Sequence, residues 1–277
     1  MRVLTKKGLL SLLLVTIFLC GFCVSSWAAE PKTKIIATTS LIASLTKEIG
    51  KDKIEVSTII PPASCPGHFD LKIQDVKFLQ ESKAIFYHGW ENFMSKLVQA
   101  SPNKEGALRQ IKVQGNWMVP NLQKQAALAI AEELGKLDPK NKAFYEKNAV
   151  NYNKRVDHAT AKIKAKAAEK VAGKPIICSA LQKDLMEWLG CQVVGVYGRA
   201  EDLTPQKTVQ MIEVGKKHQA HIVIDNLQSG PGAGKAIAKE LGIKDVTLTN
   251  FPGGLTNTET YLKALEKNVN LILTNWK

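Results

Sequence analysis

The sequence lacks the motifs that mark the common enzyme active sites. It contains no G-x-S-x-G elbow, no H-E-x-x-H zinc motif and no other obvious catalytic motif. The glycine-rich stretch SGPGAGK, residues 229–235, lacks the G-x-x-x-x-G-K-[ST] spacing of a phosphate-binding loop, so we interpret it as a turn before a helix. These absences disfavour an enzyme. The one enzymatic alternative left open is a nucleophile recruited at Cys65 or Cys178.

Cysteine is also scarce. Only Cys65, Cys178 and Cys191 lie beyond the first thirty of the 277 residues. In an oxidising compartment, an odd number leaves at least one thiol without an internal disulfide partner. A helix of about ten residues separates Cys178 from Cys191 and sets them about 15 Å apart, whereas a disulfide needs Cα atoms within about 7 Å. A Cys65–Cys178 bridge stays open as an alternative.

The chain has a single long uncharged apolar run, from Gly8 to Val24. Three basic residues precede it, and the small residues Ser26 and Ala28 follow it closely. The run is too short for a convincing membrane span, and this arrangement predicts a secretory signal peptide over residues 1–28. Neither cysteine of this leader follows a small residue, as lipid attachment would require. We therefore expect an exported protein, periplasmic or at the cell surface, without a lipid anchor.

The formal net charge of the chain is +13. It stays positive without the leader, which carries three basic residues and no acidic one. Excess positive charge can indicate a nucleic-acid or membrane-surface partner, but exported proteins rarely meet nucleic acid, and the lysines are spread along predicted helices. We expect a solvated basic exterior and no nucleic-acid partner.

Apolar, β-branched runs alternate with helical patterns from Lys32 onward. The first strand ends at Ser40, a candidate N-cap for a helix that Gly50 ends. In the first half, the pattern predicts further strands at 54–60 and 84–89 and further helices at 73–82 and 92–100. In the second half, it predicts strands at 174–179, 191–198, 221–226 and 245–250, each followed by a helix. Such alternation favours parallel sheets flanked by helices.

Between these two halves, residues 121–171 show almost no strand pattern. The apolar residues beyond Pro139 recur at spacings of three and four and mark one face of a long helix: Tyr145, Ala149, Tyr152, Val156, Ala159 and Ile163. Thirty helical residues span about 45 Å, enough to run along two lobes. We predict an α/β protein of two Rossmann-like lobes, each a parallel sheet flanked by helices, joined by a long rigid spine helix. The expected parts are a signal peptide 1–28, an N-terminal lobe 29–137, the spine 138–172 and a C-terminal lobe 173–277.

Five segments carry a resemblance to a known family. In order they are TTSLIASLTKEIG (38–50), PPASCPGHFDLKIQDVKFLQESKAIFYHG (61–89), WMVPNLQKQAALAIAEELGKLDPKNKAFYEKNAVNYNKRV (117–156), AEDLTPQKTVQMIEVGKK (200–217) and YLKALEKNVNLI (261–272). Together they resemble the metal-binding solute-binding proteins of ABC importers, which capture zinc or manganese outside the cytoplasmic membrane. The resemblance implies one metal ion in the cleft between the lobes, two ligands from each lobe, and delivery to an ABC permease. It also implies that the helix joining the lobes resists large hinge closure. We expect a monomer.

The resemblance breaks at the metal ligands. His68 falls on the family's first ligand histidine, but the second position, with its flanking tryptophan and proline in register, is Gly115. The third position aligns with Ser179 and the fourth with Asn250. One imidazole with a hydroxyl and an amide does not hold zinc or manganese tightly. Either the site uses other donors, or the ligand is not a bare ion.

Two cysteines are candidate replacements. Cys65 precedes His68 by three residues on one loop, and Cys178 ends a strand of the other lobe. Two thiolates with an imidazole favour zinc, copper(I) or cadmium over manganese. Asp225, at the end of another strand, is a further anionic candidate or else caps the following turn. The predicted metal site therefore comprises His68, Cys65, Cys178, Ser179, Asp225 and Asn250. In the alternative interpretation, Cys178 is a small residue of the hydrophobic core and Cys65 is a loop cysteine without a ligand role.

The predicted function is that of an extracytoplasmic solute-binding protein. It would capture a metal ion, soft or borderline in character, or a metal-containing small ligand, and deliver it to the permease. Two alternatives stay open on the same fold: a protein that binds an organic solute, and a surface adhesion or chaperone-like protein whose metal site has decayed.

Overall fold

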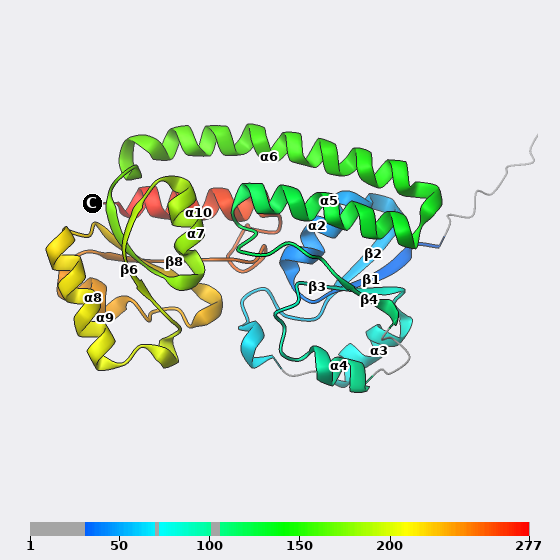
Figure 1. Cartoon of the computed structure of the whole chain (residues 1–277), viewed down its shortest axis with the longest axis horizontal. Helices are drawn as coiled ribbons and strands as arrows, with labels where there is room; N and C mark the ends of the chain where they lie inside the picture. The colour runs from blue at the N-terminus through cyan, green and yellow to red at the C-terminus, as the bar shows by residue number, and fades with distance from the viewer. Residues whose placement is uncertain (1–30, 70–71, 101–105, 277) are drawn as a thin grey trace, which may run out of the picture. The chain divides into compact units, whose positions relative to one another are not determined.

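Two parallel sheets of four strands each form the framework of the described chain (Figure 1). The computed structural model describes residues 31–69, 72–100 and 106–276, and the expected signal peptide lies outside these residues. Residues from Lys32 onward form one compact unit. None of the described helices combines the length and the apolar character needed to cross a membrane.

The first lobe holds the sheet with strand order β2-β1-β3-β4. Its strands are β1 (Thr33–Ala37), β2 (Ile54–Thr58), β3 (Ala84–Tyr87) and β4 (Leu108–Gln110), and its helices are α2 (Ser40–Gly50), α3 (Ile73–Glu81) and α4 (Met94–Ala100). Thr39 caps α2, since its hydroxyl accepts a hydrogen bond from the amide of Ile42. The sequence pattern did not predict β4, which has only three residues and is too short to show a period.

The second lobe repeats this order as β6-β5-β7-β8. Its strands are β5 (Pro175–Ser179), β6 (Gln192–Tyr197), β7 (Ile222–Asn226) and β8 (Lys244–Leu248), and its helices are α7 (Lys183–Leu189), α8 (Pro205–His218), α9 (Lys235–Leu241) and α10 (Tyr261–Asn275). Short 3-10 turns occur at Lys51–Lys53, Pro66–His68, Pro139–Asn141, Ala180–Gln182, Ala200–Asp202 and Leu227–Ser229.

Two helices connect the sheets. α5 (Pro120–Leu137) leads through the turn at Pro139 into α6 (Lys142–Val171), which runs along both lobes in Figure 1. The predicted apolar face of α6 is buried at its first four positions, Tyr145, Ala149, Tyr152 and Val156. The predicted fold class, two helix-flanked parallel sheets joined by a long helix, is confirmed. The domain boundaries stay a prediction.

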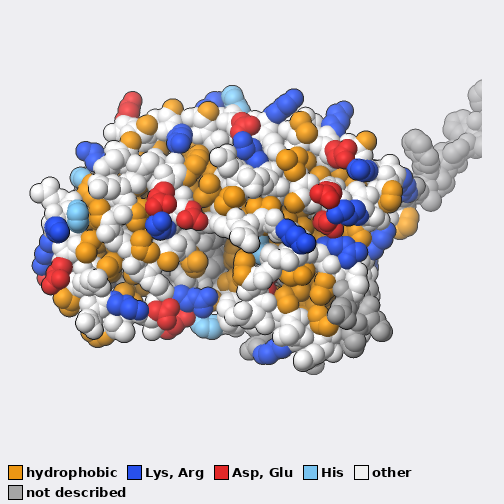
Figure 2. Space-filling model, viewed as in Figure 1, with side chains coloured by type: hydrophobic (Ala, Val, Ile, Leu, Met, Phe, Trp, Pro, Cys, Tyr) orange, Lys and Arg blue, Asp and Glu red, His pale blue; other side chains and the backbone are white. Residues whose placement is uncertain are grey.

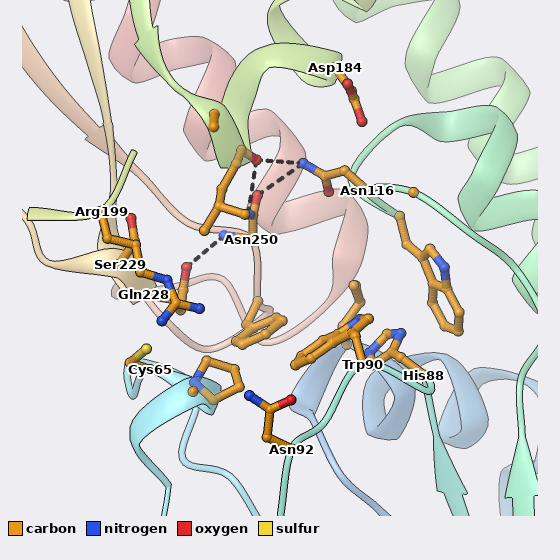
Figure 3. A pocket seen from close by; sticks show the side chains of 18 residues that line it. Cys65, His88, Trp90, Asn92, Asn116, Asp184, Arg199, Gln228, Ser229 and Asn250 are labelled. Carbon is orange, nitrogen blue, oxygen red and sulfur yellow. Dashed lines mark hydrogen bonds between the residues drawn. The ribbon is translucent and has the colours of Figure 1, made fainter. Parts of the chain in front are cut away.

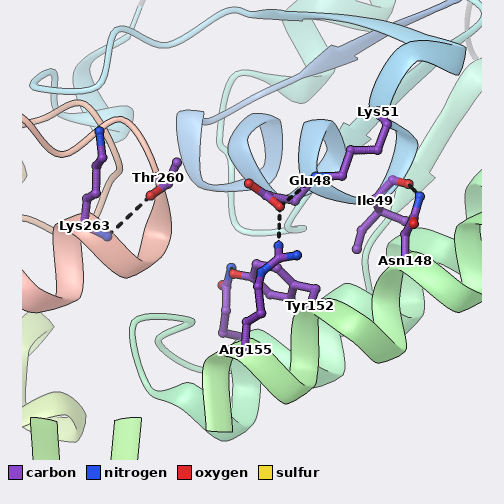
Figure 4. Close-up of polar contacts among 9 residues, drawn as sticks. Glu48, Ile49, Lys51, Asn148, Tyr152, Arg155, Thr260 and Lys263 are labelled. Atoms are coloured by element: carbon purple, nitrogen blue, oxygen red, sulfur yellow. Dashed lines mark hydrogen bonds and ion pairs between the residues drawn. The ribbon is translucent and has the colours of Figure 1, made fainter. Parts of the chain in front are cut away.

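Polar contacts fasten α6 to α2 in the first lobe (Figure 4). The Arg155 guanidinium donates to the Glu48 carboxylate at 2.5 Å, and the Asn148 amide donates to the carbonyl of Ile49 at 2.8 Å. The Arg155–Glu48 pair is partly exposed, so it contributes at most about 1 kcal/mol. The buried apolar face therefore contributes most of the stability of this contact.

Both faces of each sheet are covered. One hydrophobic core lies on the side facing α6 and spans both lobes, with Trp117, Tyr145 and Tyr261 among its largest members. On the opposite side, Ile36, Ile60 and Leu97 belong to a core of the first lobe, and Ile177, Val223 and Ile237 to a core of the second. Double coverage explains why the strands read as near-continuous apolar runs.

Candidate functional site

A pocket of about 460 Å³ lies between the two lobes, and Figure 2 shows the surface hollowed there. Parallel sheets place their ligand sites beyond the carboxyl ends of their strands. Each described strand, from β1 to β8, is followed by a residue that lines the pocket, in order Leu41, Cys65, His88, Gly115, Ala180, Arg199, Gln228 and Asn250. The strand order thus builds one site from both lobes.

Three aromatic and four amide side chains are among the 18 residues that line the pocket (Figure 3). The aromatic residues are Trp90, Trp117 and Phe251, and the amides are Asn92, Asn116, Gln228 and Asn250. Arg199 and Asp184 add one charge of each sign. Zinc, manganese and similar ions need several anionic or imidazole donors. This lining suits an organic molecule better than a bare divalent ion.

His88 lines the pocket but is almost completely buried. Burial lowers its pKa to about 4, against a smaller opposing effect of the nearby Glu91 carboxylate. Its Nε2 lies 3.0 Å from the hydroxyl of Thr39. The imidazole is therefore neutral at physiological pH, with one of its ring nitrogens already engaged.

Of the predicted site residues, Cys65 and Asn250 line the pocket, and His68 and Ser179 do not. The His68 side chain is 68% exposed, with its Nε2 3.8 Å from a carboxylate oxygen of Glu201. Ser179 is buried at the end of β5, where its hydroxyl accepts from the amide of Leu181. Of the two predicted ligands on this loop, only Cys65 lines the pocket, together with its neighbours Pro66 and Gly67.

Cys178 lies in the core shared by both lobes, fully buried, and it is not part of the pocket lining. Burial raises the pKa of its thiol to about 12, so it is not a thiolate at neutral pH. Cys65, Cys178 and Cys191 are all free, so the structure contains no Cys65–Cys178 bridge.

The Asp225 carboxylate turns into its own lobe instead of the cleft. It accepts hydrogen bonds from the amides of Gly232 and Gly234, at 2.9 and 3.0 Å, and from the hydroxyl of Tyr197. These glycines belong to the stretch SGPGAGK, whose amides therefore bind an internal carboxylate. Across residues 31–69, 72–100 and 106–276, no three His, Cys, Asp or Glu side chains gather to hold a metal ion.

An amide network, which we define as Asn116, Gln182 and Asn250 with the carbonyl of Leu181, lies between the lobes; Figure 3 shows its Asn116 and Asn250. The carbonyl of Leu181 accepts from Asn116 at 2.8 Å and from Asn250 at 3.1 Å. The side-chain oxygen of Asn250 accepts from Gln182 at 3.1 Å and from Asn116 at 3.4 Å. The resemblance implies metal ligands at positions 115 and 250. In this chain, the amide of Asn250 and the amide of Asn116, next to Gly115, belong to this neutral network instead.

Further bonds cross between the lobes. The hydroxyl of Ser40 donates to the carbonyl of Pro252 at 2.7 Å, and Gln228 donates to the carbonyl of Pro62 at 2.8 Å. The hydroxyl of Tyr261 donates to the carbonyl of Met118 at 3.1 Å. Together with the amide network, these bonds hold the lobes in contact around the pocket.

Sequence reasoning did not single out several lining residues, among them Trp90, Asn116 and Arg199. A usable indication was present for Trp90, since it lies three residues beyond the end of β3, where a sheet of this kind binds ligands. Arg199 follows β6 in the same way. The pattern did not reveal which side chains on these loops face the cleft.

Residues 35–275 match the model of a protein family described as the periplasmic component A of the zinc-uptake complex. This chain belongs to that family. The predicted relationship to metal-binding solute-binding proteins of ABC importers is confirmed, and the family is one of substrate-binding components, in agreement with the prediction that the protein is not an enzyme. The periplasmic description agrees with the exported location expected from the leader.

Two curated relatives illustrate what this chain is similar to. The manganese ABC transporter substrate-binding lipoprotein PsaA of Streptococcus mitis is 30% identical over 204 residues, which cover 63% of this chain and 65% of that protein. The metal ABC transporter substrate-binding lipoprotein SsaB of Streptococcus sanguinis is 32% identical over 176 residues, or 53% of this chain and 56% of that protein. The matched region therefore spans less than two thirds of these relatives.

Solved structures share the fold over most of the chain. The laminin-binding protein Lbp of Streptococcus pyogenes superposes with a TM-score of 0.73 at 22% identity, covering 89% of this chain and 99% of that one. A manganese-bound periplasmic metal-binding protein from Candidatus Liberibacter asiaticus gives a TM-score of 0.75 at 17% identity, covering 88% and 99%. At these identities the likeness establishes the fold.

Proposed function

We propose that this member of the zinc-uptake family is the extracytoplasmic solute-binding component of an ABC importer whose cargo is a metal-containing small ligand. It captures the ligand in the interlobe pocket and delivers it to a permease in the cytoplasmic membrane. One observation carries the proposal. The pocket has about 460 Å³ of space lined by aromatic and amide groups, beside an amide network at positions where the family resemblance implies ion ligands.

Cargo in the form of a complex fits this pocket better than a bare ion does. A zinc ion held by protein alone uses about four nitrogen, sulfur or carboxylate donors. In this chain His68 is exposed outside the pocket lining, and Cys178 is a protonated core residue. A chelated ion brings its donors with it, so the protein needs only to recognise the organic part. The ion carried within such a complex is of the zinc or manganese kind found in the family, or a softer one.

Delivery requires the lobes to part. The proposed path is docking of both lobes on the permease, followed by a modest opening that breaks the bonds across the cleft. Each such hydrogen bond contributes about 1 kcal/mol, so opening costs a few kcal/mol. That cost is small enough for docking to a partner to supply. We propose that the protein acts as a monomer in this cycle.

A metal-free organic solute is the second candidate cargo. The same aromatic and amide lining favours it, because that lining recognises organic surface whether or not an ion is attached. An adhesion role draws on the laminin-binding name of the Streptococcus pyogenes structure, whose fold this chain shares. It does not explain the pocket.

Calorimetric titration of the metal-free protein separates these cargoes. Zn²⁺, Ni²⁺ and Cu²⁺ are each added alone and then as complexes with citrate, histidine or pyridine-2,6-dicarboxylate. We expect stoichiometric binding of at least one complex, no comparable binding of the bare ions, and stimulation of the cognate permease's ATP hydrolysis by the loaded protein. Binding of a bare ion that is lost in both His68→Ala and Cys178→Ser would instead support the thiolate site. Equal binding of chelator with and without metal would support the organic solute.

The processing of the chain is also a proposal. Residues 1–28 would be removed on export, leaving the lobe 29–137, the spine 138–172 and the lobe 173–277. The intact mass of the exported protein measures this directly. A mass that begins at residue 29 supports the cleavage, whereas a mass that retains the leader or carries a lipid argues against it.

A further inference from the structure

The wall of the pocket contributed by the first lobe contains an indole that is only half buried. Trp90 is 49% exposed and lines the pocket, although most large apolar side chains near the cleft are buried. Its ring stacks on the buried imidazole of His88 at a centroid distance of 4.9 Å and an angle of 18°. His88 in turn meets the buried Trp117 edge-on at 4.4 Å. Trp90 is thus the outer ring of an aromatic stack and keeps about half of its surface exposed.

The loop that carries Trp90 is fastened by a buried carboxylate. Glu91 accepts hydrogen bonds from the amides of His88 and Gly89, at 2.8 and 2.7 Å, and from the hydroxyl of Thr38 at 2.5 Å. Gly89 has φ +110°, a conformation that favours glycine. If hydrophobic packing alone set its position, the indole of Trp90 would be buried. The hydrogen bonds of Glu91 instead hold the loop so that the indole stays partly exposed at the cleft. That arrangement suits a stacking platform for a planar ring.

A guanidinium stands on the opposite side of the pocket in Figure 3. Arg199, from the second lobe, lies across Gly67 so closely that a Cβ at that glycine would come within 2.8 Å of Nη1. Its side chain is 42% exposed, and Glu201 is 3.7 Å from Nη1. That contact is loose and solvated, so much of the guanidinium's hydrogen-bonding capacity is left for a ligand. A guanidinium matches a carboxylate with two parallel hydrogen bonds.

We propose that the pocket recognises a small planar aromatic or heteroaromatic carboxylate, with its ring stacked on Trp90 and its carboxylate bound by Arg199. This inference rests on the proposed solute-binding role and names the chemical class of the cargo. Such a molecule can arrive free or as the organic part of a metal complex, and the two sources share this recognition. The exposed amide of Asn92, on the Trp90 side, adds a donor and an acceptor for ring substituents. The volume of about 460 Å³ falls within the range of small-molecule sites.

The test uses calorimetry with the mature protein and a matched series of probes. The probes are pyridine-2,6-dicarboxylate, benzoate, cyclohexanecarboxylate and pyridine, each with Zn²⁺ and with EDTA. We expect the aromatic acids to bind at least about tenfold more tightly than the saturated acid or the uncharged ring, since stacking and a charge-assisted pair each contribute about 1–2 kcal/mol. If the aromatic acids bind more tightly with Zn²⁺ than with EDTA, the ligand is the metal complex. If they bind equally well in both conditions, the ligand is the free acid. Both results uphold the inference. Equal affinity for the aromatic and saturated acids overturns it, as does no binding of either aromatic acid at millimolar concentration.

Variants with matched controls locate the site. Trp90→Leu and Arg199→Met should each weaken binding of the aromatic acids by about tenfold or more. Trp188→Leu removes a tryptophan that contacts Lys164 outside the pocket, and Arg155→Met removes an arginine on α6; both should bind as the parent does. Circular dichroism confirms that each variant is folded. Equal losses in the pocket and control variants overturn the inference.

Failure of the inference and failure of the proposed function give different results. If another complex binds and stimulates the permease while Trp90→Leu and Arg199→Met have no effect, the transport role stands and the ligand class is wrong. If the aromatic acids bind through these residues but the loaded protein does not stimulate the permease, the ligand class stands and the transport role is wrong.

Discussion

The side-chain amide of Asn116 donates a 2.8 Å hydrogen bond to the carbonyl of Leu181, and this bond joins one lobe to the other. The same carbonyl accepts from Asn250, a position where the family resemblance implies a metal ligand. The family resemblance implies that a metal ion would lie between the lobes at this place. In this chain neutral amides join the lobes here, and the proposed organic ligand would occupy the adjoining pocket.

Removing the Asn116 side chain should loosen the lobes. In Asn116→Ala the carbonyl of Leu181 and the side-chain oxygen of Asn250 each lose a donor, so we expect the free energy of unfolding to fall by about 1 kcal/mol. Small-angle scattering should show a larger radius of gyration without ligand. The control is Gln114→Ala, an exposed amide two residues away. Identical scattering and stability in the two variants would show that the amide network does not hold the cleft.

Restoring a histidine at position 115 should not restore a metal site. Gly115 has φ +97°, and a Cβ there would lie 2.8 Å from a methyl group of Leu122. We expect Gly115→His to lose about 1–3 kcal/mol of stability from backbone strain, and equilibrium dialysis to detect no gain in Zn²⁺ binding. Gly106→His is the matched control, since open space surrounds a Cβ at that position. Tight zinc binding by a stable Gly115→His protein would refute this expectation.

The mature thiols should differ sharply in reactivity. Cys65 lines the pocket, whereas Cys178 and Cys191 are buried, and burial raises the pKa of each of these two thiols to about 12. In the native mature protein we expect Ellman's reagent to modify one thiol rapidly and the other two only after denaturation. Cys65→Ser should abolish the rapid phase. A rapid phase that survives this substitution would mean that a second thiol is accessible.

Much of the fold could be predicted from the sequence, because long segments carry strong periodicity. The apolar spacing from Tyr145 to Val156 predicted the buried face of α6, and each apolar run from TKIIA to DVTL became a strand. Strand β4 was missed because its pairing with β3, not a local pattern, makes it a strand. Tertiary contact decides such short elements.

The site could be predicted less well, for a physical reason. The family resemblance pointed to Asn250 and the spacing to His68 pointed to Cys65, and both residues line the pocket. The ends of strands suggested Cys178 and Asp225, but a strand end does not indicate which way a side chain turns. Cys178 points into the core, and Asp225 points into the glycine turn. Trp90 and Arg199 lie on loops whose conformation depends on distant partners such as Thr38 and Gly67.

Stability should depend on pH through Asp245 on β8. Burial, with the charge and a hydrogen bond of Asp225, raises the pKa of Asp245 from 3.8 to about 7. The folded protein therefore holds a proton that the unfolded chain releases, so this contribution is fully present below pH 4 and is lost as the pH rises to 7. Asp245→Asn keeps a neutral group and should raise stability at pH 8, on the order of 1 kcal/mol after discounting for partial exposure. Thermal unfolding at pH 5 and pH 8 measures this.

The control for Asp245 is Asp52→Asn, which neutralises an exposed carboxylate in the first lobe. It should leave the difference in stability between pH 5 and pH 8 as it is in the parent protein. If Asp245→Asn also leaves that difference unchanged, the pKa of Asp245 is not raised in the folded protein.

A crystal structure of the mature protein grown with Zn²⁺ and pyridine-2,6-dicarboxylate tests the central claim most directly. We expect planar density against the indole of Trp90, with a carboxylate about 3 Å from the guanidinium of Arg199 and any zinc ion held by the chelator. An isolated zinc ion bound by Cys65 and His68, with no ring on Trp90, would contradict the claim that this cleft recognises an organic carboxylate.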